Sequence, residues 1–150
     1  MRKNLRIAAS GLGALALGCG VMLPLAAQNT HQDLVSSLLN AAERLAKQNG
    51  YSSTHSRYNG QLNEGQDKNV TLDLDAGTSY FIVGQCDSDC SDIDLWLYDE
   101  NNNLIDEDVL VDDTPIVEVT PIRNARFTIR ARMVTCRVEP CYYGIGVYGR

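Results

Sequence analysis

From about residue 58 onward, apolar and polar positions alternate with a period of two in a series of short segments. Such alternation is typical of antiparallel strands that have one buried face and one face in water. The segments expected to form strands lie near residues 58–62, 70–75, 80–83, 93–98, 104–108, 116–119, 127–133 and 143–147. Turn-forming residues separate them, such as Gly77 and the asparagines 101–103. The pattern predicts a mainly β protein, an antiparallel β-sandwich or jelly roll of about eight strands.

Before residue 50 the pattern has a helical period, with apolar residues three and four positions apart. These residues are Leu34, Leu38, Ala41, Ala42 and Leu45. Thr30 is expected to cap the helix, with Asp33 three residues later as in a capping box. Asn49 and Gly50 supply a stop signal, because both residues tolerate the left-handed backbone conformation. The sequence therefore predicts a short N-terminal helix within residues 28–50, followed by a polar linker over residues 51–57.

The chain begins with three basic residues within its first six positions, followed by an apolar stretch without charge over residues 7–25. Ala26 and Ala27 offer a cleavage site, so residues 1–27 are predicted to be a secretory signal peptide. An uncleaved membrane anchor is one alternative, although several glycines in the stretch disfavour a stable helix. Lipidation of Cys19 is another alternative, because residues 16–19 faintly resemble a lipoprotein box.

The chain is acidic, and loss of the leader makes it more so. Removal of three cations and no acid changes the formal net charge from −6 to −9. A surface of this charge repels nucleic acid and anionic lipid, and it suits the binding of cations. About 120 residues remain, enough for one domain, which is predicted to span residues 58–150. No stable membrane span is expected once the leader is removed.

Four cysteines remain after the leader, as the close pairs Cys86, Cys90 and Cys136, Cys141. An even number in an exported chain predicts a disulfide framework. Three connectivities are possible, and the local pairs Cys86–Cys90 and Cys136–Cys141 are favoured. A zinc site is the competing interpretation, since the spacing permits it, but zinc requires thiolates in a reducing compartment.

Carboxylates surround the first cysteine pair. Asp87, Asp89, Asp92 and Asp94 lie within eight residues, and such a group repels itself unless it is solvated or shares a cation. Calcium suits an oxygen-rich loop of this kind, although the register is not that of an EF-hand. The alternative is a solvated loop in which the aspartates cap turn amides. A second acidic cluster, at residues 106–108 and 112–113, is expected to be an ordinary solvated turn.

Aromatic and basic side chains form two further candidate surfaces. Trp96 and Tyr98 share one face of a predicted strand and are candidates to stack on a sugar or a peptide. The alternative is that the helix or the second sheet covers the aromatic residues, which include Tyr142, Tyr143 and Tyr148. The arginines Arg126, Arg130 and Arg132 line one face of a strand, where cross-strand pairing with carboxylates is expected.

Three segments together resemble the bacterial pre-peptidase C-terminal (PPC) domain. They are residues 74–80, 92–101 and 125–130, and the resemblance covers roughly residues 58–149. It implies a jelly-roll-like sandwich of the type appended to secreted peptidases and related to collagen-binding modules, some of which bind calcium. The two cysteine pairs are not part of the general pattern, so the chain looks like a cysteine-bearing, stand-alone variant.

Catalytic motifs are not evident. His31 and His55 are the only histidines and belong to no nucleophile or metal motif, and Gly-x-Ser-x-Gly does not occur. The predicted function is that of a secreted or periplasmic non-enzymatic binding or structural module, stabilised by calcium, with a protein or polysaccharide ligand and no nucleic acid. One alternative is an accessory protein, inhibitor or chaperone of a secreted peptidase. Another is a hydrolase that uses the acidic loop.

Overall fold

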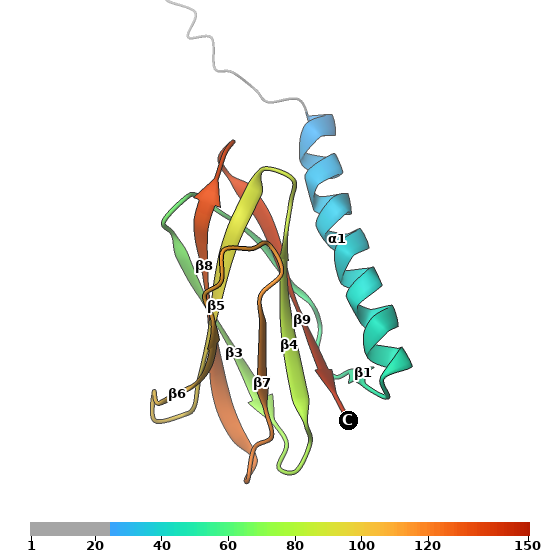
Figure 1. Ribbon diagram of the computed structural model, residues 1–150, viewed down its shortest axis with the longest axis vertical. Helices are drawn as coiled ribbons and strands as arrows, with labels where there is room; N and C mark the ends of the chain where they lie inside the picture. The colour runs from blue at the N-terminus through green and yellow to red at the C-terminus, as the bar shows by residue number, and fades with distance from the viewer. Residues whose placement is uncertain (1–24) are drawn as a thin grey trace, which may run out of the picture.

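Two antiparallel sheets and one helix account for residues 25–150, which the computed structural model describes (Figure 1). The helix α1 spans Leu25–Gln48, and the strands are β1 Ser52–Ser53, β2 Tyr58–Leu62, β3 Asp67–Leu74, β4 Tyr80–Cys86, β5 Cys90–Tyr98, β6 Leu104–Asp108, β7 Ile116–Val119, β8 Ala125–Cys136 and β9 Cys141–Gly149. All eight predicted strands are present, and β1 is added within the expected linker. Cys19 and most of the predicted leader lie outside the described residues.

The strands form a sandwich-like arrangement, which confirms the predicted fold class. The helix-side sheet contains β7, β4 and β9 in that order, and both β1 and β2 pair with the far edge of β9. The outer sheet has the order β3-β8-β5-β6. Alternate side chains of β3, β5 and β8 are buried between the sheets, because successive residues of a strand point to opposite faces. Within residues 25–150, no helix is long and apolar enough to cross a bilayer.

Helix α1 covers the helix-side sheet with a different stripe from the one expected. Val35, Leu39 and Ala46 are buried, whereas Leu45 of the predicted stripe is 60% exposed. The reason lies on β9, where a Cβ at Gly144 would come within 2.9 Å of both Val35 Cγ1 and Leu39 Cδ1. A glycine at this position therefore lets the helix backbone approach the sheet along the neighbouring stripe.

The ends of the helix were predicted with unequal success. Residues 25–29 are already helical, so Thr30 lies inside α1 and is not its N-cap, which corrects the expected start. The helix ends at Gln48, and Gly50 follows with φ of +81°, the left-handed conformation that a glycine terminator adopts. The C-terminal stop signal was local in the chain, and the structure confirms it.

Both cysteine pairs join the two sheets at the same end of the sandwich. Cys86 ends β4 in the helix-side sheet and is bonded to Cys90 at the start of β5 in the outer sheet. Cys136 ends β8 in the outer sheet and is bonded to Cys141 at the start of β9 in the helix-side sheet. The predicted local pairing is therefore correct, and no thiolate remains on these four residues for zinc. Two disulfides are typical of an oxidising compartment, extracellular or periplasmic.

Candidate functional site

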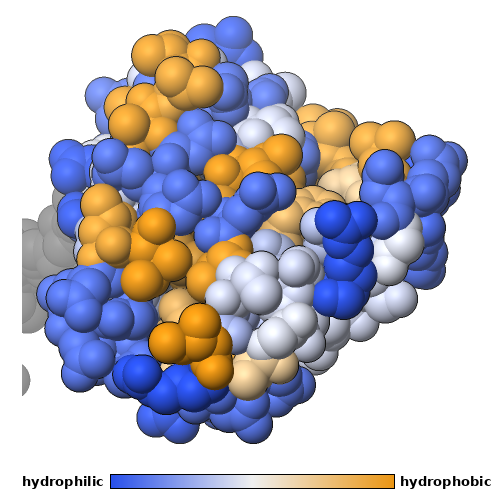
Figure 2. All heavy atoms as spheres, turned by 60° about the horizontal axis from the view of Figure 1, so that its bottom comes forward, coloured by the Kyte–Doolittle hydropathy of each residue, from blue (hydrophilic) through white to orange (hydrophobic). Residues whose placement is uncertain are grey.

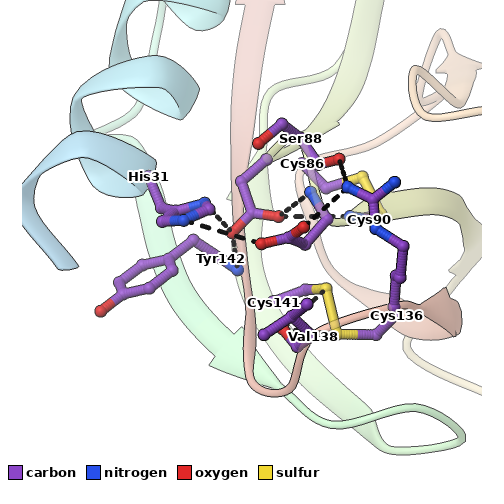
Figure 3. Close-up of polar contacts among 11 residues, drawn as sticks. His31, Cys86, Ser88, Cys90, Cys136, Val138, Cys141 and Tyr142 are labelled. Atoms are coloured by element: carbon purple, nitrogen blue, oxygen red, sulfur yellow. Dashed lines mark hydrogen bonds and ion pairs between the residues drawn. A yellow bond between two sulfur atoms is a disulfide. The ribbon is translucent and has the colours of Figure 1, made fainter. Parts of the chain in front are cut away.

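The end of the sandwich that carries the disulfides also holds a polar cluster built around Asp87 (Figure 3). The Asp87 carboxylate is almost fully buried and accepts hydrogen bonds from the backbone N–H groups of Asp89, Cys90 and Tyr142. The N–H of Asp87 in turn donates to the carbonyl of Tyr142 at 3.0 Å. Asp87 thus connects the turn closed by the first disulfide to the strand that follows the second one.

His31 reaches this cluster from the helix. Its Nδ1 lies 3.1 Å from Asp87 Oδ2, at the distance of an ion pair but without the angle of a hydrogen bond. Its Nε2 lies 3.6 Å from Asp89 Oδ2, and its ring stacks on Tyr142 with 6.1 Å between the ring centres. Both ring nitrogens face carboxylates of the protein, so the geometry suits attachment of the helix better than proton transfer to a ligand.

Arg137, from the second disulfide loop, completes the cluster. Its guanidinium donates to Asp89 Oδ1 at 2.9 Å and to the carbonyl of Ser88 at 3.3 Å. Its own N–H donates to the carbonyl of Asp89 at 2.8 Å. The two disulfide loops are therefore hydrogen-bonded to each other, and His31 fixes the helix to the first of them and to Tyr142 on β9.

A groove of about 620 Å³ opens beside this cluster, between the helix and the edge of the helix-side sheet. The helix contributes Gln32 and Val35, β2 contributes residues 59–61, and β9 contributes Tyr142 and Tyr143. Three side-chain amides and the Tyr142 ring thus line one concave surface, whereas the Tyr143 side chain points into the core between the sheets. Each amide offers both a donor and an acceptor, and none of the lining side chains is ionised at neutral pH.

Gly60, on the strand beside the groove, packs against the core side chain of Tyr143. A Cβ at this position would lie 2.8 Å from Cε1 of Tyr143, so the glycine leaves room for the ring. The Tyr143 side chain is mostly buried, and burial raises the pKa of its hydroxyl above the ordinary value of 10.0. The phenol therefore stays neutral and can take part in hydrogen bonds as donor or acceptor.

The four aspartates predicted to bind calcium do not form one ligand set. Asp87 is occupied by backbone N–H groups and by His31, and Asp89 is paired with Arg137. Asp94 lies near Asp92, whose charge is the largest acting on its carboxyl, and the charge of Asp112 acts on both. Within residues 25–150, no group of three or more His, Cys, Asp or Glu residues has an arrangement that could hold a metal ion.

Asp92 lies in a bulge of β5. The pairing of β5 with β8 shifts on either side of Asp92, and the backbone N–H of Ile93 donates to the carbonyl of Asp112. Asp92 is only 6% exposed, and its Oδ1 has no hydrogen-bond partner among the described residues. Burial first, and then the charge of Asp112, raise the pKa of this carboxyl above its ordinary value of 3.8.

Asp92→Asn is expected to raise the free energy of unfolding by about 1 kcal/mol at neutral pH, because the folded state no longer buries this charge. The folded state holds the Asp92 proton more tightly than the unfolded state does, so ionisation weakens the fold as pH rises through the raised pKa. The advantage of the variant is therefore fully present at neutral pH, shrinks as pH falls through that pKa and is lost below 3.8. Urea unfolding at several pH values measures it.

The matched control is Asp73→Asn, because the Asp73 carboxylate is exposed and pairs with Arg126 at 3.2 Å. We expect this exposed substitution to change stability by less than about 1 kcal/mol. A stability difference between Asp92→Asn and the original chain that stays constant across the pH range would contradict the prediction, as would a variant less stable than the original at neutral pH.

Trp96 and Tyr98 lie on the solvent side of the outer sheet, which the helix does not cover, since α1 packs on the other sheet. The guanidinium carbon of Arg130 lies 5.0 Å from the centre of the Trp96 ring. The ligand-binding role of Trp96 and Tyr98 stays a prediction. Tyr148, in contrast, is buried under the helix and donates its hydroxyl to the carbonyl of Leu39 at 3.3 Å.

The predicted pairing of the arginines is confirmed. Arg126 contacts Asp73, while Arg130 and Arg132 lie 2.6 and 3.9 Å from the carboxylate of Asp67. The cross-strand register of β3 and β8 places Asp73 directly opposite Arg126. Arg130 therefore contacts both the carboxylate of Asp67 and the ring of Trp96.

Sequence reasoning missed His31 and the amides of the groove as members of a site. His31 belongs to no short motif, and Asn59 and Gln61 lie in a five-residue strand without an unusual composition. The available signal was Gly144, because a glycine within a strand indicates the close approach of another group, here the helix.

The fold and the groove define an antiparallel β-sandwich braced by two disulfides and covered on one sheet by a helix. No protein-family model matches the chain, and no curated protein is similar to it at a significant level. The resemblance to the pre-peptidase C-terminal domain therefore rests on the residues quoted above.

Proposed function

We propose that this chain is an exported, non-enzymatic binding module whose ligand lies in the groove between α1 and the β2–β9 edge. The observation that carries the proposal is the polar but uncharged lining of this groove, with the amides of Gln32, Asn59 and Gln61 beside the ring of Tyr142. Ligand sites of this size, concave and with a few convergent polar groups, are the usual form of small-molecule sites.

The chemistry of the lining favours a neutral ligand rich in hydroxyl groups, namely a saccharide. Amide groups can accept from one hydroxyl and donate to the next, which matches the alternating donors and acceptors of a sugar ring. The Tyr142 ring, partly exposed at the groove, offers an apolar face for the C–H groups of such a ring. The predicted leader and the two disulfides support a periplasmic or secreted location, where polysaccharides are available.

The groove is tested by NMR titration of the ¹⁵N-labelled chain with three neutral hexasaccharides, built from glucose in β-linkage, glucose in α-linkage and N-acetylglucosamine. We expect amide shifts at residues 59–61 and 142–143 for at least one of them. Gln61→Ala is expected to weaken that binding about five- to tenfold, as loss of one hydrogen bond to the ligand does.

Gln48→Ala is the matched control, because Gln48 is exposed on the same helix but lies at its far end from the groove. It should leave the affinity unchanged. Shifts confined to the face of Trp96 and Tyr98 would move the site to the outer sheet and contradict the proposal. Absence of any shift with all three saccharides would also contradict it.

A further inference from the structure

An unusual share of exposed apolar side chains lies where the edge strands β6 and β7 of the two sheets meet. The connecting segment contains Val109, Leu110 and Val111, which are 47%, 68% and 86% exposed. Leu104, Ile105 and Ile116 on the two strands are exposed as well. We call these six residues the seam surface. Three consecutive exposed aliphatic side chains are rare on a protein that functions without a partner there.

The seam surface continues into an apolar groove at the end of the sandwich opposite the disulfides. This groove, of about 290 Å³, is lined by Ile105, Val119, Ile122 and Phe127. Ile122 at its rim is 92% exposed. Figure 2 looks toward this end of the molecule and shows hydrophobic residues at the surface between hydrophilic ones.

The edge of β7 is already closed by side chains of β6, so it is not free to add another strand. Asp106 Oδ2 accepts from the backbone N–H of Glu118 at 2.7 Å, and Asp108 Oδ2 accepts from that of Ile116 at 2.9 Å. Carboxylates of β6 therefore satisfy outward N–H groups of β7, which blocks edge-to-edge pairing. A partner would therefore contact the side chains of the seam surface and not its backbone.

The charge around the seam surface itself is of one sign, and Arg123 at the adjoining groove is in an ion pair with Glu100. No lysine or arginine occurs between Lys68 and Arg123, whereas fourteen of the nineteen acidic residues of the chain do. Among the described residues, none of the carboxylates from Asp106 to Glu118 is in an ion pair with a basic side chain. Their negative field is therefore not neutralised locally and attracts cations.

We propose that the seam surface binds a cationic amphipathic segment of a partner protein. The apolar face of such a segment covers the exposed aliphatic side chains, and its lysines or arginines face the unpaired carboxylates. A second copy of this chain is the wrong partner for this face, because it brings acid against acid. Anionic lipid is repelled for the same reason. Since β6 is about 17 Å long, a helix of about eleven residues spans the seam.

The test uses a fluorescein-labelled amphipathic peptide of leucine and lysine, about 18 residues long, with anisotropy as the readout. The full chain is compared with Leu110→Ser/Val111→Ser at one end of the seam and Ile122→Ser at the other. We expect each variant to bind the peptide about tenfold more weakly, because each removes apolar contact area. Val138→Ser is the matched control, since Val138 is also exposed but lies in the second disulfide loop, and it should bind normally.

The electrostatic part is tested with Glu107→Gln/Glu118→Gln, which should weaken binding and make it less sensitive to salt. Asp33→Asn/Asp75→Asn removes two exposed acids elsewhere and is expected to leave both properties unchanged. Circular dichroism verifies that every variant is folded. The proposal is overturned if the peptide binds all variants equally, if a peptide of serine and lysine binds as tightly, or if no binding occurs at low salt. Variants of the groove beside α1 should not affect this binding, which separates the two proposals.

Discussion

Asp87→Ala is expected to lower the free energy of unfolding by about 3 kcal/mol, because it removes an acceptor shared by three donors in a buried turn. The carboxylate accepts from the N–H groups of Asp89, Cys90 and Tyr142 at 3.1, 3.3 and 2.9 Å. Alanine offers these three N–H groups no acceptor. Urea unfolding measures the loss, with the fluorescence of Trp96, the only tryptophan of the chain, as the signal.

Asp89→Ala is the control for this prediction, since it removes a neighbouring carboxylate whose strong contact is the exposed side chain of Arg137. We expect it to cost less than about 1 kcal/mol, as an exposed ion pair does. His31→Gln separates the remaining contribution, that of the helix contact. Equal losses for Asp87→Ala and Asp89→Ala would show that the buried hydrogen bonds at Asp87 do not carry the stability.

Removal of both disulfides, by alanine at Cys86, Cys90, Cys136 and Cys141, is expected to cost about 4 kcal/mol. Each bridge closes a short loop and contributes about 2 kcal/mol by restricting the unfolded chain. The melting temperature should fall by roughly 15 °C for a domain of this size. Differential scanning calorimetry of the oxidised, reduced and substituted chains measures the change.

Each bridge removed alone provides the comparison for the double removal. Both bridges connect the same two sheets at the same end, and Cys90 lies opposite Cys136 in the register of β5 and β8. One intact bridge therefore still holds the sheets together, and each single removal should cost about half of the total or less. A melting temperature that does not respond to reductant, or ready alkylation of all four sulfurs without denaturant, would contradict the bracing role.

The strands were predictable because their information is local. Alternation in β3, β5 and β8 marks one buried face without knowledge of the partner strand. The turn after β5 was equally predictable, because asparagine readily adopts the left-handed conformation, and Asn102 does so with a φ of +63°. The buried face of the helix was less predictable, because two adjacent apolar stripes both have the helical period. The choice between them depended on Gly144, about a hundred residues away.

The acidic loop shows why the candidate site was harder to predict than the fold. The spacing of Asp87 and Asp92 indicates that they are close in sequence, but a turn and a bulge lie between them. Asp87 is directed to backbone amides and His31, whereas Asp92 is buried beside Asp112. Which neighbours a carboxylate receives depends on long-range packing, so the spacing of the four aspartates could not establish a shared calcium site, which stays a prediction.

Two properties of this protein follow from the chain alone: a β-sandwich, from the alternation of apolar residues, and two local disulfides, from the spacing of the cysteines. The groove beside α1, the attachment of His31 to Asp87 and the acidic seam between β6 and β7 exist only in the folded molecule. Each of them joins residues from distant segments, and no local preference of the backbone specifies which distant segments will meet.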